Sequence, residues 1–335
     1  MQTYNVSLLD IEYYLPDAIE SNYSLGKLYP EWNIDRTEAR TGVYSRHIAR
    51  SEETAYDLSL KATSKFFERY PFLREKIDAI ITCTQSPDYA IPSNSFLLQR
   101  DLNLKHNILA FDYNLACSGY IYGLFMAKSF INSGYVKNVL LVTADTYSKY
   151  INQTDRSTRV LFGDGATASW IGNADLNNIN PLISNFDDFI FSSEGENWDK
   201  FTIKIGGSRN PISNENFILH NKISMSGIQV INFLNHRVIP QVKELISRNK
   251  LGVDGISHFF LHQASLLAIE SFRNRLKISS DKSFSNIEKI GNTVSSSLPI
   301  LIKDYFTTHS MLKDRKIILC GFGAGLSAAS ILATK

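Results

Sequence analysis

The chain is poor in cysteine and carries almost no net charge. Three cysteines among 335 residues exclude a disulfide-stapled scaffold. The 35 Lys and Arg residues nearly balance 33 Asp and Glu residues, and the resulting charge of +2 argues against a dedicated nucleic-acid binder. With 44% hydrophobic residues, the sequence is typical of an ordinary globular protein of about two domains or one large composite domain.

Signals for export or membrane insertion are also missing. The N-terminus lacks a basic start followed by a long apolar stretch, so we expect a cytoplasmic protein with reduced thiols and no membrane partner. The uncharged run Ile317–Ala333 is shorter than the about 20 residues of a membrane helix. Because Gly321, Gly323 and Gly325 alternate within it, the run predicts a buried strand, a tight turn and a returning strand.

Metal and nucleotide signatures are absent as well. The sequence has no Cys-x-x-Cys pair and no phosphate-binding loop. His258 and His262 are four residues apart, but the intervening Phe259-Phe260-Leu261 predicts a strand, which would separate their side chains by about 13 Å. We therefore expect neither a metal nor any other bound cofactor.

Short Ile-, Val- and Leu-rich runs alternate with longer helical patterns, which predicts an α/β architecture. The expected strands are Ile77–Thr84, Val139–Thr143, Phe259–His262 and Lys316–Cys320. The expected helices are Glu53–Arg69, Ser118–Ser133, Ile228–Arg248 with a kink at Pro240, and Ala264–Leu276. Similar strand, motif and helix intervals recur in the two halves, which indicates either a duplicated fold or the ordinary spacing of βαβ units.

Cys117 stands apart from the other cysteines. Cys83 and Cys320 lie within apolar runs and are interpreted as core side chains. Cys117 precedes Ser118-Gly119, where a helical pattern begins. A helix start offers unpaired N–H groups and a positive dipole end, which favour the nucleophilic thiolate. From the residues alone, a nucleophile and a packed core thiol are both open interpretations.

Two further polar residues lie at the ends of predicted elements. His262 ends the strand Phe259-Phe260-Leu261, and ligand sites of α/β sheets collect at such carboxyl ends. Asn292, within Gly291-Asn292-Thr293, precedes a helical pattern. A structural histidine and a helix N-cap asparagine are the alternatives to a catalytic role.

Five motifs occur in order along nearly the whole chain. They are Ala116-Cys117-Ser118-Gly119, Leu161-Phe162-Gly163-Asp164-Gly165-Ala166, His262-Gln263-Ala264, Gly291-Asn292-Thr293 and Gly321-Phe322-Gly323-Ala324-Gly325. Together they resemble β-ketoacyl-ACP synthase III, a condensing enzyme of the thiolase superfamily. The resemblance implies a five-layered αβαβα thiolase fold with two similar halves, residues 1–175 and 176–335, and a homodimer.

The resemblance also implies a mechanism. Cys117, His262 and Asn292 fall on the family's Cys-His-Asn triad. An acyl group from acyl-CoA would load on Cys117, with the N–H groups of Cys117 and Ala324 as the oxyanion hole. Decarboxylative Claisen condensation with a malonyl thioester on acyl carrier protein would then give a 3-oxoacyl thioester for fatty-acid or specialised biosynthesis, such as that of secondary metabolites or surface polysaccharides.

Other roles follow from the same resemblance. Arg40 and Arg156 match the family's coenzyme A contacts, and Trp32 matches when about four extra residues precede Arg40. Ile91 falls where a partner subunit reaches into the acyl pocket. Asn232 and Leu267 occupy positions that are typically basic and contact acyl carrier protein, which predicts a dedicated carrier.

Two competing functions remain at this stage. An acyltransferase would pass the acyl group on Cys117 to an amine or hydroxyl acceptor without decarboxylation, and the triad does not separate this reaction from condensation. A non-catalytic α/β scaffold would need only structural Cys, His and Asn residues.

Overall fold

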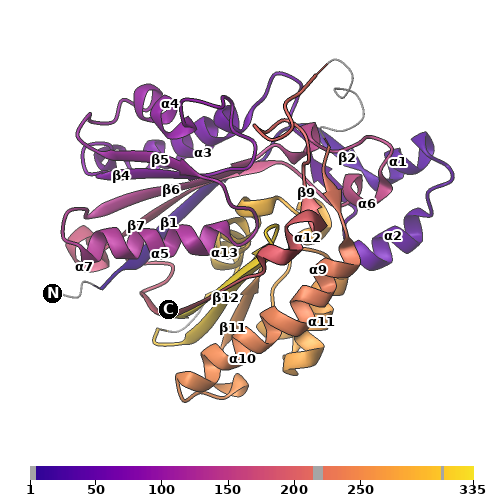
Figure 1. Cartoon of the computed structure of the whole chain (residues 1–335). Helices are drawn as coiled ribbons and strands as arrows, with labels where there is room; N and C mark the ends of the chain where they lie inside the picture. Colours follow the sequence, from indigo (N-terminus) through magenta and orange to yellow (C-terminus); the bar gives the residue numbers. More distant parts are fainter. Residues whose placement is uncertain (1–4, 214–221, 311–312) are drawn as a thin grey trace.

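Two β-sheets organise the computed structural model (Figure 1), which describes residues 5–213, 222–310 and 313–335. The first sheet has five strands in the order β1-β7-β6-β4-β5, and the second has four in the order β11-β12-β13-β8. The first comprises β1 (Ser7–Tyr14), β4 (Ala79–Cys83), β5 (Leu109–Tyr113), β6 (Asn138–Asp145) and β7 (Gly165–Gly172). The second comprises β8 (Asn185–Ser193), β11 (His258–Leu261), β12 (Lys316–Gly323) and β13 (Ser327–Thr334).

The two sheets share one strand pattern. In the first, β4 pairs parallel to β6, β6 antiparallel to β7, and β7 antiparallel to β1. In the second, β11 pairs parallel to β12, β12 antiparallel to β13, and β13 antiparallel to β8. A helix precedes the second strand of each series: α5 (Gly119–Asn132) before β6 and α13 (Ser297–Thr308) before β12. The predicted internal duplication is thus present in the topology.

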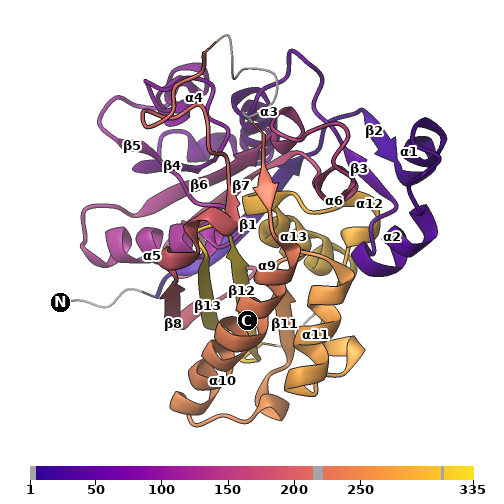
Figure 2. The ribbon, with the colours of Figure 1, turned by 45° about the vertical axis from the view of Figure 1, so that its right-hand side comes forward.

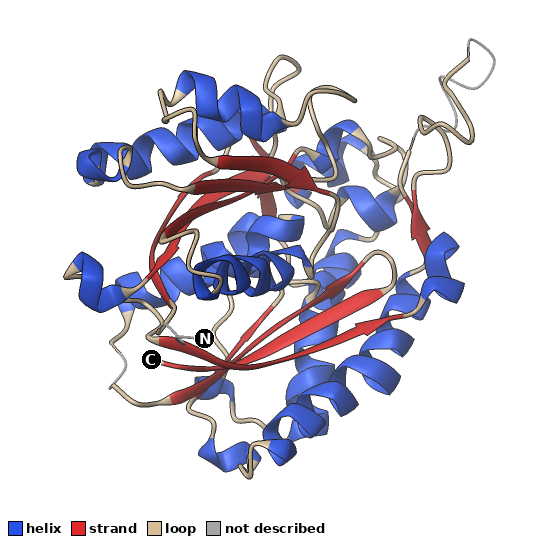
Figure 3. Cartoon of the chain, turned by 60° about the vertical axis from the view of Figure 1, so that its left-hand side comes forward, coloured by secondary structure: helices blue, strands red, loops and turns tan. Residues whose placement is uncertain are grey.

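Helices and sheets form five layers, which Figure 3 shows from the side. Helices α5 and α13 lie between the sheets and contact strands of both. Helices α3 (Ala55–Arg69) and α4 (Asn94–Asp101) cover the outer face of the first sheet, and α10 (Ile239–Arg248) and α11 (Leu266–Leu276) lie outside the second. The αβαβα thiolase fold expected from the sequence is therefore confirmed.

The remaining elements are short. The helices are α1 (Asn22–Leu28), α2 (Ile34–Thr41), α6 (Arg156–Arg159), α7 (Ala174–Asn177), α9 (Gly227–Phe233) and α12 (Ile287–Ile290). The strand pairs are β2 (Ile19–Ser21) with β3 (Ser45–His47), and β9 (Phe201–Thr202) with β10 (Ser224–Met225). The short 3-10 helical segments, together with the π-helical η4, are η1 (Pro71–Leu73), η2 (Tyr147–Lys149), η3 (Gly195–Lys200), η4 (Leu234–Val238), η5 (Val253–Gly255), η6 (Ser280–Lys282) and η7 (Val294–Ser296).

Local chemistry explains where two predicted helices differ from the observed ones. The Thr54 hydroxyl accepts from the Asp57 N–H, and the Asp57 carboxylate accepts from the Thr54 N–H, so this capping box starts α3 at Ala55. The predicted helix Ile228–Arg248 consists of α9, the π-helical turn η4 and α10, with Pro240 in the first turn of α10. A proline lacks an N–H, so an irregular turn just before it is expected.

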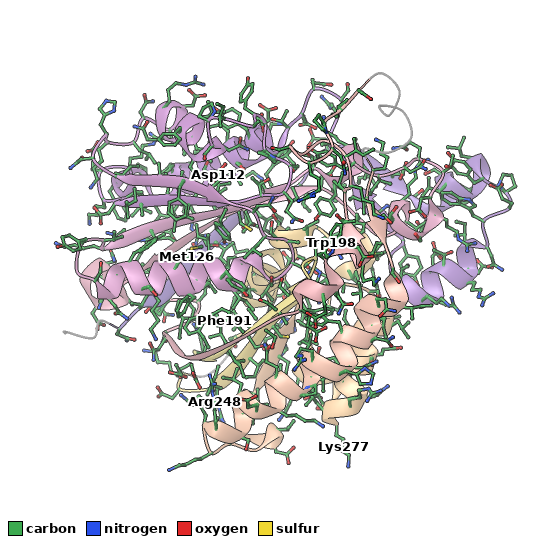
Figure 4. The ribbon with its side chains drawn as sticks, viewed as in Figure 1. Asp112, Met126, Phe191, Trp198, Arg248 and Lys277 are labelled. Carbon is green, nitrogen blue, oxygen red and sulfur yellow. The ribbon has the colours of Figure 1, made fainter. Side chains whose placement is uncertain are left out.

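The space between the sheets is filled by apolar side chains. Met126 on α5 and Phe191 on β8 lie on facing elements, and both pack against the same buried cluster (Figure 4). Strand β12 turns into β13 within the uncharged run Ile317–Ala333, as the alternating glycines predict. The turn of this hairpin lies beside the start of α5, where the Ser327 hydroxyl is 2.8 Å from the Ser118 hydroxyl.

Candidate active site

A cavity of about 680 Å³ opens where the two halves meet. Its walls come from α2, α6, α9 and α11, which lie together on one side of the molecule (Figure 2). Cys117, His262 and Asn292 all line this cavity, and so do Arg40 and Arg156. The structure thus brings together five site residues that the sequence places far apart.

Cys117 lies in the tight turn between β5 and α5. The Gly119 N–H donates to the Ala116 carbonyl at 2.7 Å, and Cys117 itself is buried. The β12 strand passes very close: a Cβ atom on Gly323 would lie 2.9 Å from the Cys117 sulfur, and one on Gly321 would lie 2.5 Å from the Cys117 carbonyl oxygen. Glycine is therefore required at these positions to let the second half approach the sulfur.

The surroundings of the sulfur oppose its ionisation. Burial raises the pKa of the Cys117 thiol above its ordinary value, and the nearby Asp145 carboxylate raises this pKa further. The expectation that the helix start would favour the thiolate is thus not met. Burial arises from the hairpin and the second sheet, neither of which is local in the sequence.

His262 follows directly after β11 and is buried at the cavity wall. Burial lowers the pKa of His262 to about 3, so its imidazole is neutral at pH 7. Its Nδ1 atom has no hydrogen-bond partner in the part of the chain that the structure describes. A neutral imidazole carries one N–H, which makes His262 a donor that bears no charge.

Asn292 lies in a turn that the first half holds in place. Its N–H donates to the Leu161 carbonyl at 2.9 Å, and its carbonyl accepts from the Gly163 N–H at 3.0 Å. The Asn292 side-chain oxygen accepts from the Val294 N–H at 2.9 Å. Helix α13 begins only at Ser297, so Asn292 is not its N-cap. The side-chain NH₂ group is left as the donor for a ligand.

The other predicted residues lie elsewhere. Ala324 lines a neighbouring cavity of about 600 Å³, which shares Phe201 with the first. Trp32 is not among the cavity-lining residues; it stacks on Tyr29 and packs against Val160, which does line the cavity. Ile91 projects from the surface with 87% of its area exposed. The roles of these residues stay predictions.

Sequence reasoning missed Arg36 and Phe322. Arg36 lines the cavity one helical turn before Arg40 on α2, so the i, i+4 spacing was an available signal. The Phe322 ring meets the His262 ring edge-on, with centroids 5.9 Å apart. Phe322 occurs within a predicted motif, but only the folded hairpin places it beside His262.

Neither a metal-binding cluster nor a membrane-spanning helix is found among the described residues. No group of three or more His, Cys, Asp or Glu side chains there could hold a metal ion. No helix among those residues combines the length and the apolar character that crossing a membrane requires.

The fold and the cavity define a thiolase-fold protein with a buried Cys-His-Asn site, and comparisons with known proteins agree. The family model for 3-oxoacyl-[acyl-carrier-protein (ACP)] synthase III matches residues 111–186. The model for the C-terminal part of the same enzyme matches residues 246–335. A β-ketoacyl-[acyl-carrier-protein] synthase III from Aliarcobacter butzleri is 35% identical, over 95% of this chain and 94% of the relative. The relative of the same name from Clostridioides difficile is 32% identical, over 96% of this chain and 95% of the relative.

Solved structures give the same result. A crystal structure of 3-oxoacyl-(acyl-carrier-protein) synthase III superimposes with a TM-score of 0.92 at 33% identity, covering 99% of this chain and all (100%) of the other. The structure of β-ketoacyl-[acyl carrier protein] synthase III from Thermus thermophilus gives a TM-score of 0.87 at 28% identity, covering 98% of this chain and 99% of the other. The chain belongs to the β-ketoacyl-ACP synthase III family, whose members are enzymes.

Proposed function

We propose that the protein catalyses decarboxylative condensation of a Cys117-bound acyl group with a malonyl thioester on acyl carrier protein. The observation that supports this most is the cavity in which a buried thiol, an uncharged histidine and an asparagine NH₂ group meet. Condensation needs a nucleophile to carry the acyl group and neutral donors for a developing enolate. The cycle requires no metal and no redox cofactor, because loss of CO2 drives bond formation.

In the first half-reaction, the Cys117 sulfur attacks the acyl-CoA carbonyl. The bond from this carbon to Cys117 forms, the bond to coenzyme A breaks, and the thiol proton ends on the departing sulfur. Backbone N–H groups of Cys117 and Ala324 are the proposed oxyanion donors. Since burial and Asp145 disfavour the free thiolate, we propose that the thiol loses its proton during acyl transfer and not before it.

In the second half-reaction, the malonyl carboxylate leaves as CO2, and its bonding electrons form an enolate. Hydrogen bonds from His262 and Asn292 to the thioester oxygen stabilise this charge. The enolate carbon then attacks the acyl-enzyme carbonyl, which forms the new carbon–carbon bond and releases the Cys117 thiolate. That thiolate takes up a proton, and a 3-oxoacyl thioester leaves.

Arginines at the cavity support the choice of acyl-CoA as donor. Arg36 and Arg40 from α2 and Arg156 from α6 all line it. Guanidinium groups suit phosphates, and coenzyme A carries several. Leu267, 49% exposed, and Asn232 also line the cavity, where the resemblance expects basic residues, so we propose a dedicated carrier; Arg273, Arg275 and Lys277 keep positive charge at the end of α11.

Mass spectrometry tests the first half-reaction. Incubation with acyl-CoA should add one acyl mass to the intact protein, and Cys117→Ala should abolish the adduct. No adduct on the natural protein, or an adduct that persists in Cys117→Ala, would contradict the proposal.

Release of labelled CO2 tests the second half-reaction. After acylation, carboxyl-labelled malonyl thioester should lose its label as CO2, and His262→Ala or Asn292→Ala should slow this loss by about 100-fold or more. A stable acyl-enzyme without CO2 release from any malonyl donor would instead favour acyl transfer to an amine or hydroxyl acceptor. We place the reaction in the cytoplasm, in fatty-acid or specialised biosynthesis.

A further inference from the structure

Three consecutive serines, Ser295, Ser296 and Ser297, link the Asn292 turn to both halves of the molecule. All three are buried, with 0%, 0% and 3% of their area exposed. A buried hydroxyl is retained only when it has hydrogen-bond partners. Each of these three has different partners, and together they span the boundary between the sheets.

The first two serines fasten the turn to the first sheet. The Ser295 hydroxyl donates to the Asp145 carboxylate at 2.5 Å, and that carboxylate also accepts from the Gln85 N–H at 2.8 Å. The Ser296 hydroxyl lies 2.9 Å from the Thr143 hydroxyl and 3.1 Å from the Gly165 carbonyl oxygen. These partners belong to β6 and β7 and to the loop after β4.

The third serine reaches the second sheet. The Ser297 hydroxyl accepts from the Gln263 N–H at 2.9 Å, directly beside His262. Since the His262 Nδ1 atom has no partner among the described residues, its ring depends on how its backbone is held. The His262 N–H donates to the Cys320 carbonyl at 2.8 Å, and Ser297 supplies the next hydrogen bond along the chain.

The backbone of the same turn is strained. Val294 has a φ of +55°, a left-handed conformation that a β-branched residue rarely adopts. Such a conformation persists only where the surrounding contacts enforce it. Asn292, which precedes Val294, and the three serines that follow it make such contacts.

We propose that Ser297 is a positioning residue for His262, and that Ser295 and Ser296 anchor it to the first sheet. This serine clip, residues Ser295–Ser297, would set the His262 donor relative to Cys117 for the second half-reaction. The inference rests on the proposed function for its kinetic consequence. The position of the His262 ring can be measured without any activity.

The test compares Ser297→Ala, Ser297→Thr and Ser59→Ala with the natural protein. Ser297→Ala should slow release of labelled CO2 by about 10- to 100-fold in kcat, because His262 is displaced. Acylation of Cys117 by acyl-CoA should stay within about twofold, since the nucleophile is held by other contacts. Ser297→Thr keeps the hydroxyl and should restore the rate. Ser59→Ala is the matched control: it removes a buried hydroxyl that donates to the Ala55 carbonyl within α3, outside the serine clip, and should lower stability without this selective loss.

Nitrogen-15 spectra of histidine-labelled protein provide the readout that does not depend on activity. His262→Gln identifies the His262 signals, which should move in Ser297→Ala and stay in place in the other two variants. Unmoved His262 signals in Ser297→Ala, or an equal fall in both half-reactions, would overturn the inference. Should the natural protein neither acylate nor release CO2, the proposed function fails, and the spectra alone still decide the role of Ser297.

Discussion

At the scale of single residues, the Cys117 thiol and the Asp145 carboxylate affect each other through a buried environment. Asp145 is the last residue of β6, and its carboxylate accepts a hydrogen bond from the Ser295 hydroxyl. Burial raises the pKa of this carboxyl to about 7. The charged form of Asp145 raises the pKa of Cys117. Removing that charge should therefore make the thiol easier to ionise.

Asp145→Asn tests this coupling. We expect the pH profile of Cys117 alkylation by iodoacetamide to move to lower pH. Asn keeps one of the two acceptor oxygens, so a stability loss of about 1–3 kcal/mol is expected, and the assay is run well below the melting temperature. Cys117→Ala shows how much label Cys83 and Cys320, both buried, take up. A profile that stays in place or moves to higher pH would contradict the coupling.

A second residue-scale prediction concerns His262 and acid stability. Its pKa is about 3 in the folded protein and about 6.5 when unfolded. Between these values the unfolded state binds the extra proton, so this contribution to stability declines as pH falls below about 6.5, by up to about 1.4 kcal/mol per pH unit.

His262→Gln should therefore flatten the fall in melting temperature between pH 6.5 and 4.5, measured by calorimetry. His258 has a pKa lowered to about 4 by burial and contributes with the same sign, so some slope should persist. His236, an exposed histidine on η4, provides the matched control, because His236→Gln should keep the natural slope. Equal slopes for His262→Gln and the natural protein would show that His262 is not buried in its neutral form.

At the scale of elements, the β12–β13 hairpin determines whether Cys117 is accessible. A methyl group on Gly323 would overlap the Cys117 sulfur, at 2.9 Å. Gly323→Ala should therefore reduce the acylation rate by about 100-fold, measured by intact mass after timed incubation with acyl-CoA. Gly195→Ala is the control, since no atom lies within 4 Å of a Cβ there. Full activity in Gly323→Ala would show that the hairpin can move away.

The capping box of α3 gives a prediction about stability alone. Thr54→Ala removes the side-chain acceptor for the Asp57 N–H and should lower the free energy of unfolding by about 1 kcal/mol. Thr54→Ser keeps the oxygen and should restore most of it. The acylation rate should be unchanged, because α3 lies on the outer face of the first sheet. A loss of acylation in Thr54→Ala would mean that α3 is coupled to the cavity.

At the scale of the whole molecule, the predicted homodimer follows from the resemblance. Ile91 and its neighbours Tyr89 and Phe96 expose 87%, 58% and 52% of their area, which is unusual for apolar side chains that stay in water. We expect sedimentation equilibrium to give twice the mass of the chain. Ile91→Glu should weaken self-association, whereas Ile19→Glu, at another exposed apolar residue, should not. A monomeric natural protein would remove the basis for Ile91 in the acyl pocket.

Local patterns and ordered motifs predicted much of this molecule. Cys117, His262 and Asn292 share a cavity because each follows or precedes a predicted element at the boundary of the halves. The alternating glycines of the uncharged run Ile317–Ala333 predicted a strand, a turn and a returning strand, and this run forms the β12–β13 hairpin. These features depend on short stretches of sequence or on the order of motifs.

The rest depends on contacts between distant segments. The pKa of Cys117 is raised by burial that the second half supplies, so its helix position alone pointed in the wrong direction. Trp32 matches the family's contact only when about four extra residues precede Arg40; it packs beside the cavity wall on Tyr29 and Val160, and its role stays a prediction. The left-handed conformation of Val294 lies between Asn292, which accepts from the Val294 N–H, and the serine clip, and no local sequence signal predicts it.

The passage of β12 over Cys117 has a consequence for synthesis on the ribosome. Cys117 is made early in translation, whereas Gly321 and Gly323, which lie against it, are made near the end. A nascent chain that stops short of β12 leaves this cysteine in a first half that the second half does not yet cover, open to oxidants and to stray thioesters. The sulfur is therefore enclosed only when the second sheet assembles, so Cys117 reaches its buried position only in a nearly full-length chain.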